Sequence, residues 1–165
     1  MKKELWLFLA KLAFFSVVFG LLWFYFVQEA YPHILKPVIF PFFKLVGVRT
    51  WRLSILLDHF TNLIPYLALV CATPGFFRNW KKTVLALVVG VLILMIGHVL
   101  LSWIDYHYYA EYQRTKAFFR RIFHFYLLND ALPLGLWLLF YPRVLPRLFS
   151  FLSFGKSGPA KTASG

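Results

Sequence analysis

The stretch from Thr83 to Trp103, TVLALVVGVLILMIGHVLLSW, decides the fold class of this chain. It is the most apolar segment of the sequence, and its ~20 residues give a helix long enough to cross the ~30 Å hydrocarbon layer of a bilayer. Of the 165 residues, 61% are hydrophobic and 15% are charged. A soluble domain has roughly 25% charged residues, so we expect an integral membrane protein.

About four such segments fit into a chain of this length, and they leave no room for a soluble domain. We expect an all-α membrane protein, a bundle of about four transmembrane helices in a single domain that covers residues 1–142. The spans are expected at about 5–27, 53–72, 83–104 and 125–140. A short, basic and partly disordered cytoplasmic tail, residues 143–165, is expected to follow them.

A proline-rich segment follows the first span, YPHILKPVIFPFFKLVGVRTW from Tyr31 to Trp51. Proline lacks the backbone N–H that an α-helix needs, so Pro32, Pro37 and Pro41 are expected to prevent a long regular helix. Lysine and arginine alternate there with isoleucine, leucine and phenylalanine. This pattern is typical of an amphipathic segment that lies in the membrane interface.

Aromatic and turn residues mark the expected ends of the first two spans. Trp23 and Tyr25 are expected at the far interface, where amphipathic rings gather. Pro74-Gly75 is expected to end the second span, because proline cannot continue a helix and glycine accepts the left-handed exit. Cys71, the only cysteine, then lies in the last helical turn as a small apolar residue without an internal disulfide.

The formal charge of +12 comes from lysines and arginines that lie almost entirely between the apolar runs. In those positions they meet lipid headgroups, so we expect the bilayer as a partner and no nucleic acid. Basic residues are almost equally numerous on the two sides. The short basic turn from Arg78 to Lys82 and the basic start at Lys2 and Lys3 favour a multi-pass protein of the bacterial inner membrane with both termini in the cytoplasm.

Polar side chains occur at a similar depth in three of the expected spans. Ionisable groups are costly inside a membrane, so each is a candidate functional residue. The second span carries Asp58, His59, Thr61 and Asn62, the third carries His98, and the fourth carries Asn129 and Asp130.

Three interpretations of these residues remain open. In the first, they line a shallow pocket that opens outward, in which His98 or His59 acts as a base and Asp58 or Asp130 orients it. Asn62 and Asn129 are candidate binding residues of such a pocket. In the second interpretation, the polar residues form hydrogen bonds that hold the helices together. In the third, they form a proton or ion path. No close pair of metal ligands occurs, so neither a metal nor another cofactor is expected.

Arginines gather between the third and fourth spans, at Arg114, Arg120 and Arg121. Guanidinium groups can hold a carboxylate or phosphate through two parallel hydrogen bonds, so these are candidate binding residues. Contact with lipid headgroups is the alternative. His107 and His124 belong to the same expected outer loop and are expected in the interface.

The layout resembles that of the exosortase and archaeosortase family of membrane transpeptidases. The similarity covers roughly residues 5–141 and includes the amphipathic LKPVIFPFFKLVG, the basic turn RNWKK, and FHF before the fourth span. It implies a bundle of the same kind and a partner in protein sorting. The family's cysteine would fall in DHFTN, which has none, and its arginine would follow His98 in GHVLL, which also has none.

The missing cysteine and arginine favour an accessory protein over an enzyme, similar to the membrane proteins associated with the type H exosortase. We therefore expect a non-catalytic inner-membrane protein whose partner is an exosortase-like enzyme or its sorted substrate. A membrane-embedded hydrolase or transpeptidase that uses the Asp/His residues is the first alternative. A small proton or ion permeation protein is the second.

Overall fold

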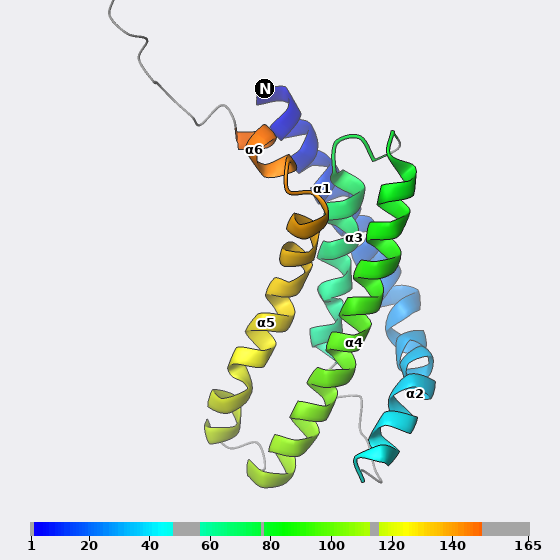
Figure 1. The fold of residues 1–165 in the computed structure, drawn as a ribbon, viewed down its shortest axis with the longest axis vertical. Helices are drawn as coiled ribbons and strands as arrows, with labels where there is room; N and C mark the ends of the chain where they lie inside the picture. Colours follow the sequence, from blue (N-terminus) through cyan, green and yellow to red (C-terminus); the bar gives the residue numbers. More distant parts are fainter. Residues whose placement is uncertain (1, 48–56, 77, 113–115, 150–165) are drawn as a thin grey trace, which may run out of the picture.

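A computed structural model describes residues 2–47, 57–76, 78–112 and 116–149, and every regular element within those ranges is helical (Figure 1). Three helical stretches in them are long and apolar enough to cross a membrane: Lys3–Leu45, Trp80–Tyr108 and Lys116–Phe140. The expected all-α membrane bundle is thereby confirmed.

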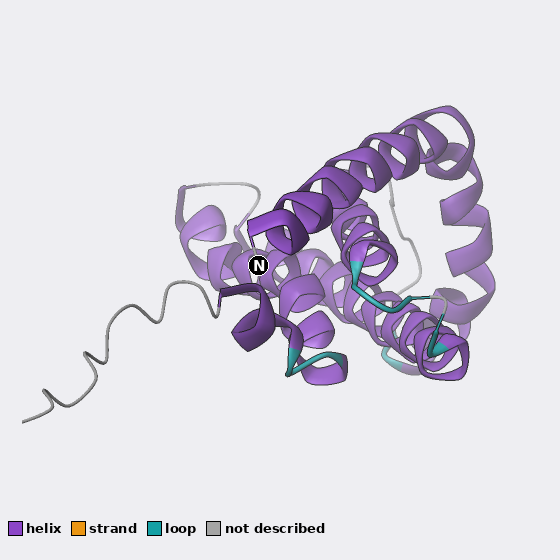
Figure 2. Cartoon of the chain, turned by 90° about the horizontal axis from the view of Figure 1, so that it is seen from above, coloured by secondary structure: helices purple, strands orange, loops and turns teal. Residues whose placement is uncertain are grey.

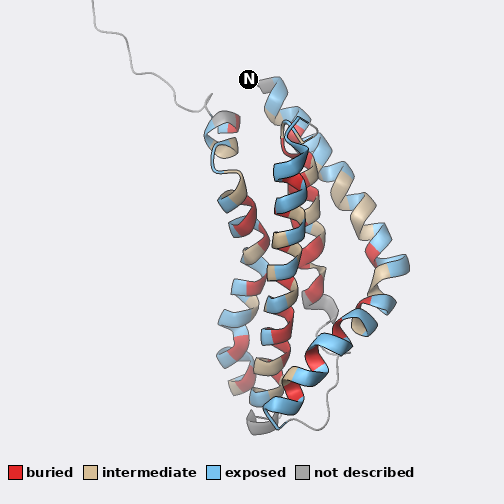
Figure 3. Cartoon of the chain, turned by 45° about the vertical axis from the view of Figure 1, so that its right-hand side comes forward, coloured by how far each residue is buried: buried red, intermediate tan, exposed pale blue. Residues whose placement is uncertain are grey.

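The first of these stretches is one continuous helical rod. It consists of α1 (Lys2–Leu22), the π-helical turn η1 (Trp23–Val27) and α2 (Gln28–Leu45). A π turn holds one residue more than an α turn and bends the helix that contains it. Figure 3 shows this bend between α1 and α2. Trp23 lies on its inner side at 4% exposure, whereas Tyr25 is 74% exposed. That both rings mark the interface stays a prediction.

The prediction that three prolines prevent a long helix after the first span was wrong. Helix α2 continues through Pro32, Pro37 and Pro41. Each proline removes one helical hydrogen bond, but packing can hold such a helix together. Four side chains of α2, one per turn, form a buried stripe that supplies this packing: Tyr31, Leu35, Ile39 and Phe43.

The second expected span is shorter in the structure. The 3₁₀ segment η3 (Leu57–Asn62) leads into α3 (Leu63–Ala72), and the expected start at residues 53–56 lies outside the described residues. Helix α3 lies in the middle of the bundle and packs against α1, α4 and α5 (Figure 1). As predicted, Gly75 follows its end with a left-handed φ of 85°.

Helices α4 (Trp80–Tyr112) and α5 (Lys116–Phe140) complete the bundle, and the short α6 (Val144–Phe149) follows them. The aromatic and basic stretch expected as an outer loop is mostly helical. Helix α4 continues beyond residue 104 to Tyr112, and α5 begins at Lys116 instead of at residue 125. Phe118 and Ile122 are buried in that added part of α5, so tertiary packing stabilises it.

The N-terminus, the turn between α3 and α4, and α6 lie at the same end of the bundle (Figure 1). The end of α2 and the junction of α4 with α5 lie at the opposite end. Seen from above, α1 is steeply inclined to the other helices (Figure 2). In Figure 3, buried positions follow the inner faces of α3, α4 and α5, while the outer faces are exposed and mostly apolar. Such faces suit contact with lipid.

Candidate functional site

A chain of buried hydrogen bonds connects four helical segments near the middle of the bundle. The Tyr31 hydroxyl of α2 lies 2.6 Å from Nδ1 of His98 in α4. On the other side of the ring, His98 Nε2 lies 2.7 Å from Oδ1 of Asn62 in η3. Asn62 Nδ2 in turn donates to the backbone carbonyl of Asn129 in α5, at 3.0 Å. We call these four residues the polar chain.

The direction of every bond in the polar chain follows from its last member. A backbone carbonyl can only accept, so the Asn62 amide nitrogen faces it and the amide oxygen faces His98. His98 Nε2 therefore carries the proton and donates to that oxygen. A neutral imidazole then presents Nδ1 as an acceptor, and the Tyr31 hydroxyl donates to it. The chain is satisfied with His98 uncharged.

Aromatic rings enclose the imidazole. The Phe60 ring is tilted over it at a centroid distance of 4.5 Å, and Tyr31 meets it edge-on at 5.7 Å. His98 is 0% exposed and Asn62 is 5% exposed. A general base needs an approach path for its substrate, and this ring has both nitrogens engaged and no exposed surface.

The structure thus brings together three of the polar residues selected from the sequence: Asn62, His98 and Asn129. Asp130 is exposed, and its Oδ1 accepts a 3.3 Å hydrogen bond from Asn129 Nδ2. The backbone of Asp58 and His59 belongs to η3, while their side chains lie outside the described part of the chain.

The arginines and the other histidines lie away from the polar chain. Arg120 and Arg121 are exposed on the first turns of α5, and Arg114 lies outside the described residues. His107 is exposed on α4 and stacks on Trp103, at a centroid distance of 6.1 Å. His124 is exposed on α5, so both histidines occupy helices and not the expected loop. Within the described ranges, no three His, Cys, Asp or Glu side chains form a group that could hold a metal.

Two further polar contacts between helices escaped the sequence analysis. Near the end of α3, Trp137 Nε1 donates to Thr73 Oγ1 at 2.8 Å, and Thr73 itself donates to the Leu69 carbonyl. Further toward the opposite end, the Tyr126 hydroxyl donates to the buried carboxylate of Asp105 at 2.8 Å. Asp105 is an ionisable residue in a long apolar helix, and this signal could have identified it.

A close approach between helices α3 and α4 depends on Gly90. The buried Tyr66 hydroxyl donates to the Ala86 carbonyl, and the phenol ring lies directly over Gly90. A Cβ atom at position 90 would overlap the hydroxyl and the ring. Small residues allow this kind of contact between membrane helices.

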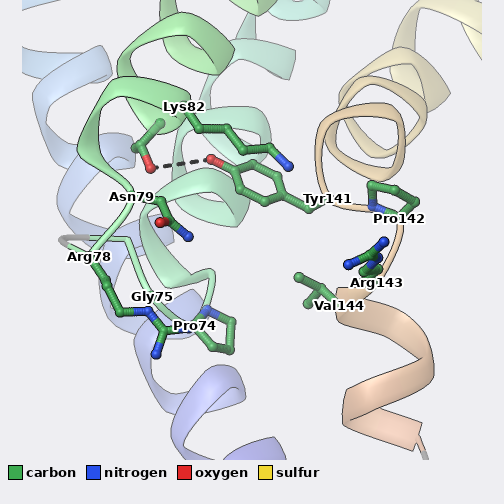
Figure 4. Close-up of a pocket in the computed structure, with 10 residues that line it drawn as sticks. Pro74, Gly75, Arg78, Asn79, Lys82, Tyr141, Pro142, Arg143 and Val144 are labelled. Carbon is green, nitrogen blue, oxygen red and sulfur yellow. Dashed lines mark hydrogen bonds between the residues drawn. The ribbon is translucent and has the colours of Figure 1, made fainter.

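A basic pocket of about 670 Å³ lies at the end of the bundle that holds the N-terminus (Figure 4). One wall is the turn from α3 into α4, and the opposite wall is the turn from α5 into α6. Its polar lining residues are Arg78, Asn79, Lys82, Thr83, Tyr141 and Arg143. We call this cavity the basic pocket.

An apolar groove of about 410 Å³ lies between α4 and α5. Gly97 and Leu132 are among its lining residues, together with other aliphatic side chains and Phe125. Asn129, the last member of the polar chain, reaches one edge of it. The groove faces outward among the lipid-facing surfaces of the two helices.

Comparison of this chain with protein families, characterised proteins and solved structures gave no significant match. The fold and the enclosed polar chain define the protein as a helical membrane protein.

Proposed function

We propose that this protein is a non-catalytic membrane partner of an exosortase-like sorting enzyme and supports that enzyme by packing helices against it. The observation that carries the proposal is the enclosure of His98. The one histidine deep in the bundle among the described residues has hydrogen-bond partners on both nitrogens and no exposed surface. This arrangement supports a role for His98 in linking helices.

The outer face of α1 supports a role in helix packing. In the apolar window of the stretch Lys3–Leu45, which begins with α1, only 6% of residues are buried within the bundle, against 33% in Trp80–Tyr108 and 28% in Lys116–Phe140. Within α1 itself, Phe8 is the one buried side chain among the described residues. Large side chains cover this face, among them Trp6, Phe14 and Val17 at 68%, 63% and 62% exposure. Helix α1 therefore has the most surface left for a second membrane protein. The kind of partner is taken from the layout that the sequence shares with the exosortase family.

The proposal is tested by affinity purification from native membranes with the full-length protein. We expect an exosortase-like enzyme to copurify with the wild type and to be lost when Phe14 and Val17 are both replaced by alanine. A matched control is Leu139→Ala, which truncates a side chain that is 72% exposed on α5. The control should retain the enzyme.

Deletion of the gene gives the second measurement. Anchoring of sorted proteins should fall in the deletion strain and return with the wild-type gene. If no sortase-like enzyme copurifies and anchoring is unchanged by deletion, the proposed function is wrong. If His98→Ala abolishes function while the protein keeps its abundance and its copurifying partner, a catalytic role replaces the packing role.

A further inference from the structure

The basic pocket joins cationic side chains from two turns that are far apart in the sequence. Arg78 and Lys82 come from the turn into α4 and its first turn, and Arg143 comes from the turn after α5 (Figure 4). All three side chains are exposed, and none of the pocket's lining residues is acidic. Their positive charges are thus gathered around one cavity without a carboxylate among its walls.

The walls of the pocket are held by internal contacts. Thr83 donates to the Phe76 carbonyl at 3.2 Å, and the Tyr141 hydroxyl donates to Thr83 at 3.4 Å, which joins the two walls. The ammonium of Lys82 lies 5.3 Å from the centre of the Tyr141 ring, a cation–π distance. These contacts fix Lys82 and Tyr141 relative to each other before any ligand arrives.

The shape and place of the pocket indicate the chemistry of its ligand. Arginine and lysine around a common cavity suit a phosphate group, which accepts several charge-assisted hydrogen bonds. The N-terminal end of the α4 dipole adds partial positive charge at the same place. The pocket also lies at the start of the apolar helix α4, whose first residue, Trp80, is 62% exposed. Tryptophan and basic residues at the end of an apolar helix are typical of the headgroup region of a membrane.

We propose that the basic pocket binds a phosphate group through Arg78, Lys82 and Arg143. Two sources share this chemistry: the headgroup of an anionic phospholipid and a soluble phosphate compound. The volume of about 670 Å³ exceeds the needs of a single phosphate, so the pocket also accepts what is attached to it. The basic pocket lies beside the C-terminal end of α3, whereas Asn62 of the polar chain lies just before the N-terminal end of α3. The proposal of a phosphate site does not depend on the proposed function.

The test uses the full-length protein in nanodiscs of phosphatidylcholine, with and without added phosphatidylglycerol. In the lipid arm, native mass spectrometry counts bound phosphatidylglycerol and thermal unfolding gives the Tm. In the soluble arm, inorganic phosphate and pyrophosphate are titrated into the discs that contain phosphatidylcholine alone. Binding in the first arm identifies a lipid headgroup, and binding in the second arm alone identifies a soluble phosphate compound.

The variants place the binding in the pocket. Replacing Arg78, Lys82 and Arg143 together by glutamine should weaken binding at least about tenfold, because it removes the three cations that attract the phosphate. It should also abolish the rise in Tm that we expect phosphatidylglycerol to give the wild type. Arg120→Gln removes an exposed cation at the opposite end of the bundle and should leave binding unchanged. Arg143→Gln alone, an exposed single change, should weaken binding severalfold and covers the case in which the triple variant fails to fold.

Three results would overturn the assignment. Wild-type protein that binds in neither arm has no phosphate site. Equal binding by wild type and Arg143→Gln places the ligand elsewhere. Equal loss in Arg120→Gln shows general attraction between a basic protein and an anionic membrane, without a built site.

Discussion

His98 and Asn62 connect η3, α2, α4 and α5 through bonds whose donors and acceptors are all defined. A buried polar group without a partner costs free energy, and inside a bilayer no water replaces the lost partner. Each bond of this kind contributes only about 0.6 kcal/mol on average in membrane proteins, but removing one member leaves two groups unsatisfied. The polar chain is therefore a sensitive point of the bundle.

Replacing His98 with alanine should lower the free energy of unfolding by about 2–4 kcal/mol. The change removes both bonds and leaves a cavity under the Phe60 ring. Steric trapping or denaturant unfolding in bicelles measures the effect. The control is Asp130→Ala at the exposed neighbour of Asn129, which should change the free energy by less than about 0.5 kcal/mol. Equal effects at the two positions would show that His98 is not needed for packing.

Replacing Gly90 with alanine should destabilise the bundle by about 1–3 kcal/mol, because the added methyl group displaces the buried Tyr66 ring. Gly135→Ala is the matched control on α5, since no atom lies within 4 Å of its added Cβ. That change should be neutral or stabilising by up to about 1 kcal/mol, as alanine favours a helix. The same unfolding measurement compares them, and a neutral Gly90→Ala would contradict the close approach.

The sequence predicted some members of the polar chain and missed another. Asn62, His98 and Asn129 could be grouped by depth, because depth follows from counting residues along each apolar run. Tyr31 could not, since it precedes a proline in a segment interpreted as interfacial. Its contact with His98 depends on the bend at η1 and on the rotation of α2, which no local pattern specifies. Whether any of these residues takes part in chemistry stays a prediction.

The rod formed by α1, η1 and α2 shows how one extra residue can be absorbed in a helix. The exposed side of η1 carries Phe24, Tyr25 and Phe26, while Trp23 points inward. The helix on each side keeps a face toward the bundle: Phe8 of α1 stacks on Trp137, and Phe43 of α2 meets Tyr106. The π turn accommodates the extra residue, so both helices keep these faces toward the bundle.

Deleting Tyr25 should convert η1 into a regular α turn and leave α2 facing the bundle. Crosslinking of Phe43→Cys to Tyr106→Cys by a short bifunctional thiol reagent, in a Cys71→Ala background, measures this, since the two rings face each other with centroids 6.2 Å apart. The crosslink should persist in the deletion variant.

Inserting one alanine after Ala30 is the control for that deletion. The insertion should abolish the crosslink, because it rotates the rest of α2 by about 100°. Loss of the crosslink on deletion, with retention on insertion, would show that the π turn does not hold an extra residue between the two bundle-facing helices.

The apolar runs predicted the long helices α1, α4 and α5, but they did not predict α2, the short length of α3, or where the helices begin and end. Residues 105–124 were expected as a loop because they are aromatic and basic. Helices continue through most of them because long helices can extend past the hydrocarbon layer, and α4 with 33 residues measures about 50 Å against ~30 Å of hydrocarbon. Hydropathy reports the solvent of a residue and does not report its backbone conformation.

Lysine and arginine side chains occur at both ends of the bundle, and the basic pocket lies at one of them. The starts of α1 and α4 and the turn after α5 lie at the end that carries the basic pocket, and these segments contain Lys3, Lys81 and Arg143 (Figure 1). The end of α2 and the start of α5 lie at the opposite end, and they contain Lys44 and Arg120. Which end faces the cytoplasm stays a prediction from the positive-inside rule.

Single cysteines in a Cys71→Ala background should divide these five positions into two sets. Lys3→Cys, Lys81→Cys and Arg143→Cys should react with a membrane-impermeant maleimide from one side of the membrane, which we expect to be the cytoplasmic side. Lys44→Cys and Arg120→Cys should react only from the other side. Labelling in intact cells against opened vesicles measures this, and any exchange between the two sets would contradict the bundle topology.

The polar chain also makes His98 a spectroscopic reporter of assembly. The carbonyl of Asn129 cannot exchange its role with a donor, so the ring proton is confined to Nε2. An imidazole restricted to one tautomer gives a separate ¹⁵N resonance for each nitrogen, whereas exchange between tautomers averages them. Nitrogen NMR of selectively labelled histidine would therefore show, from a single ring, whether η3, α2, α4 and α5 are still joined in a given detergent or lipid.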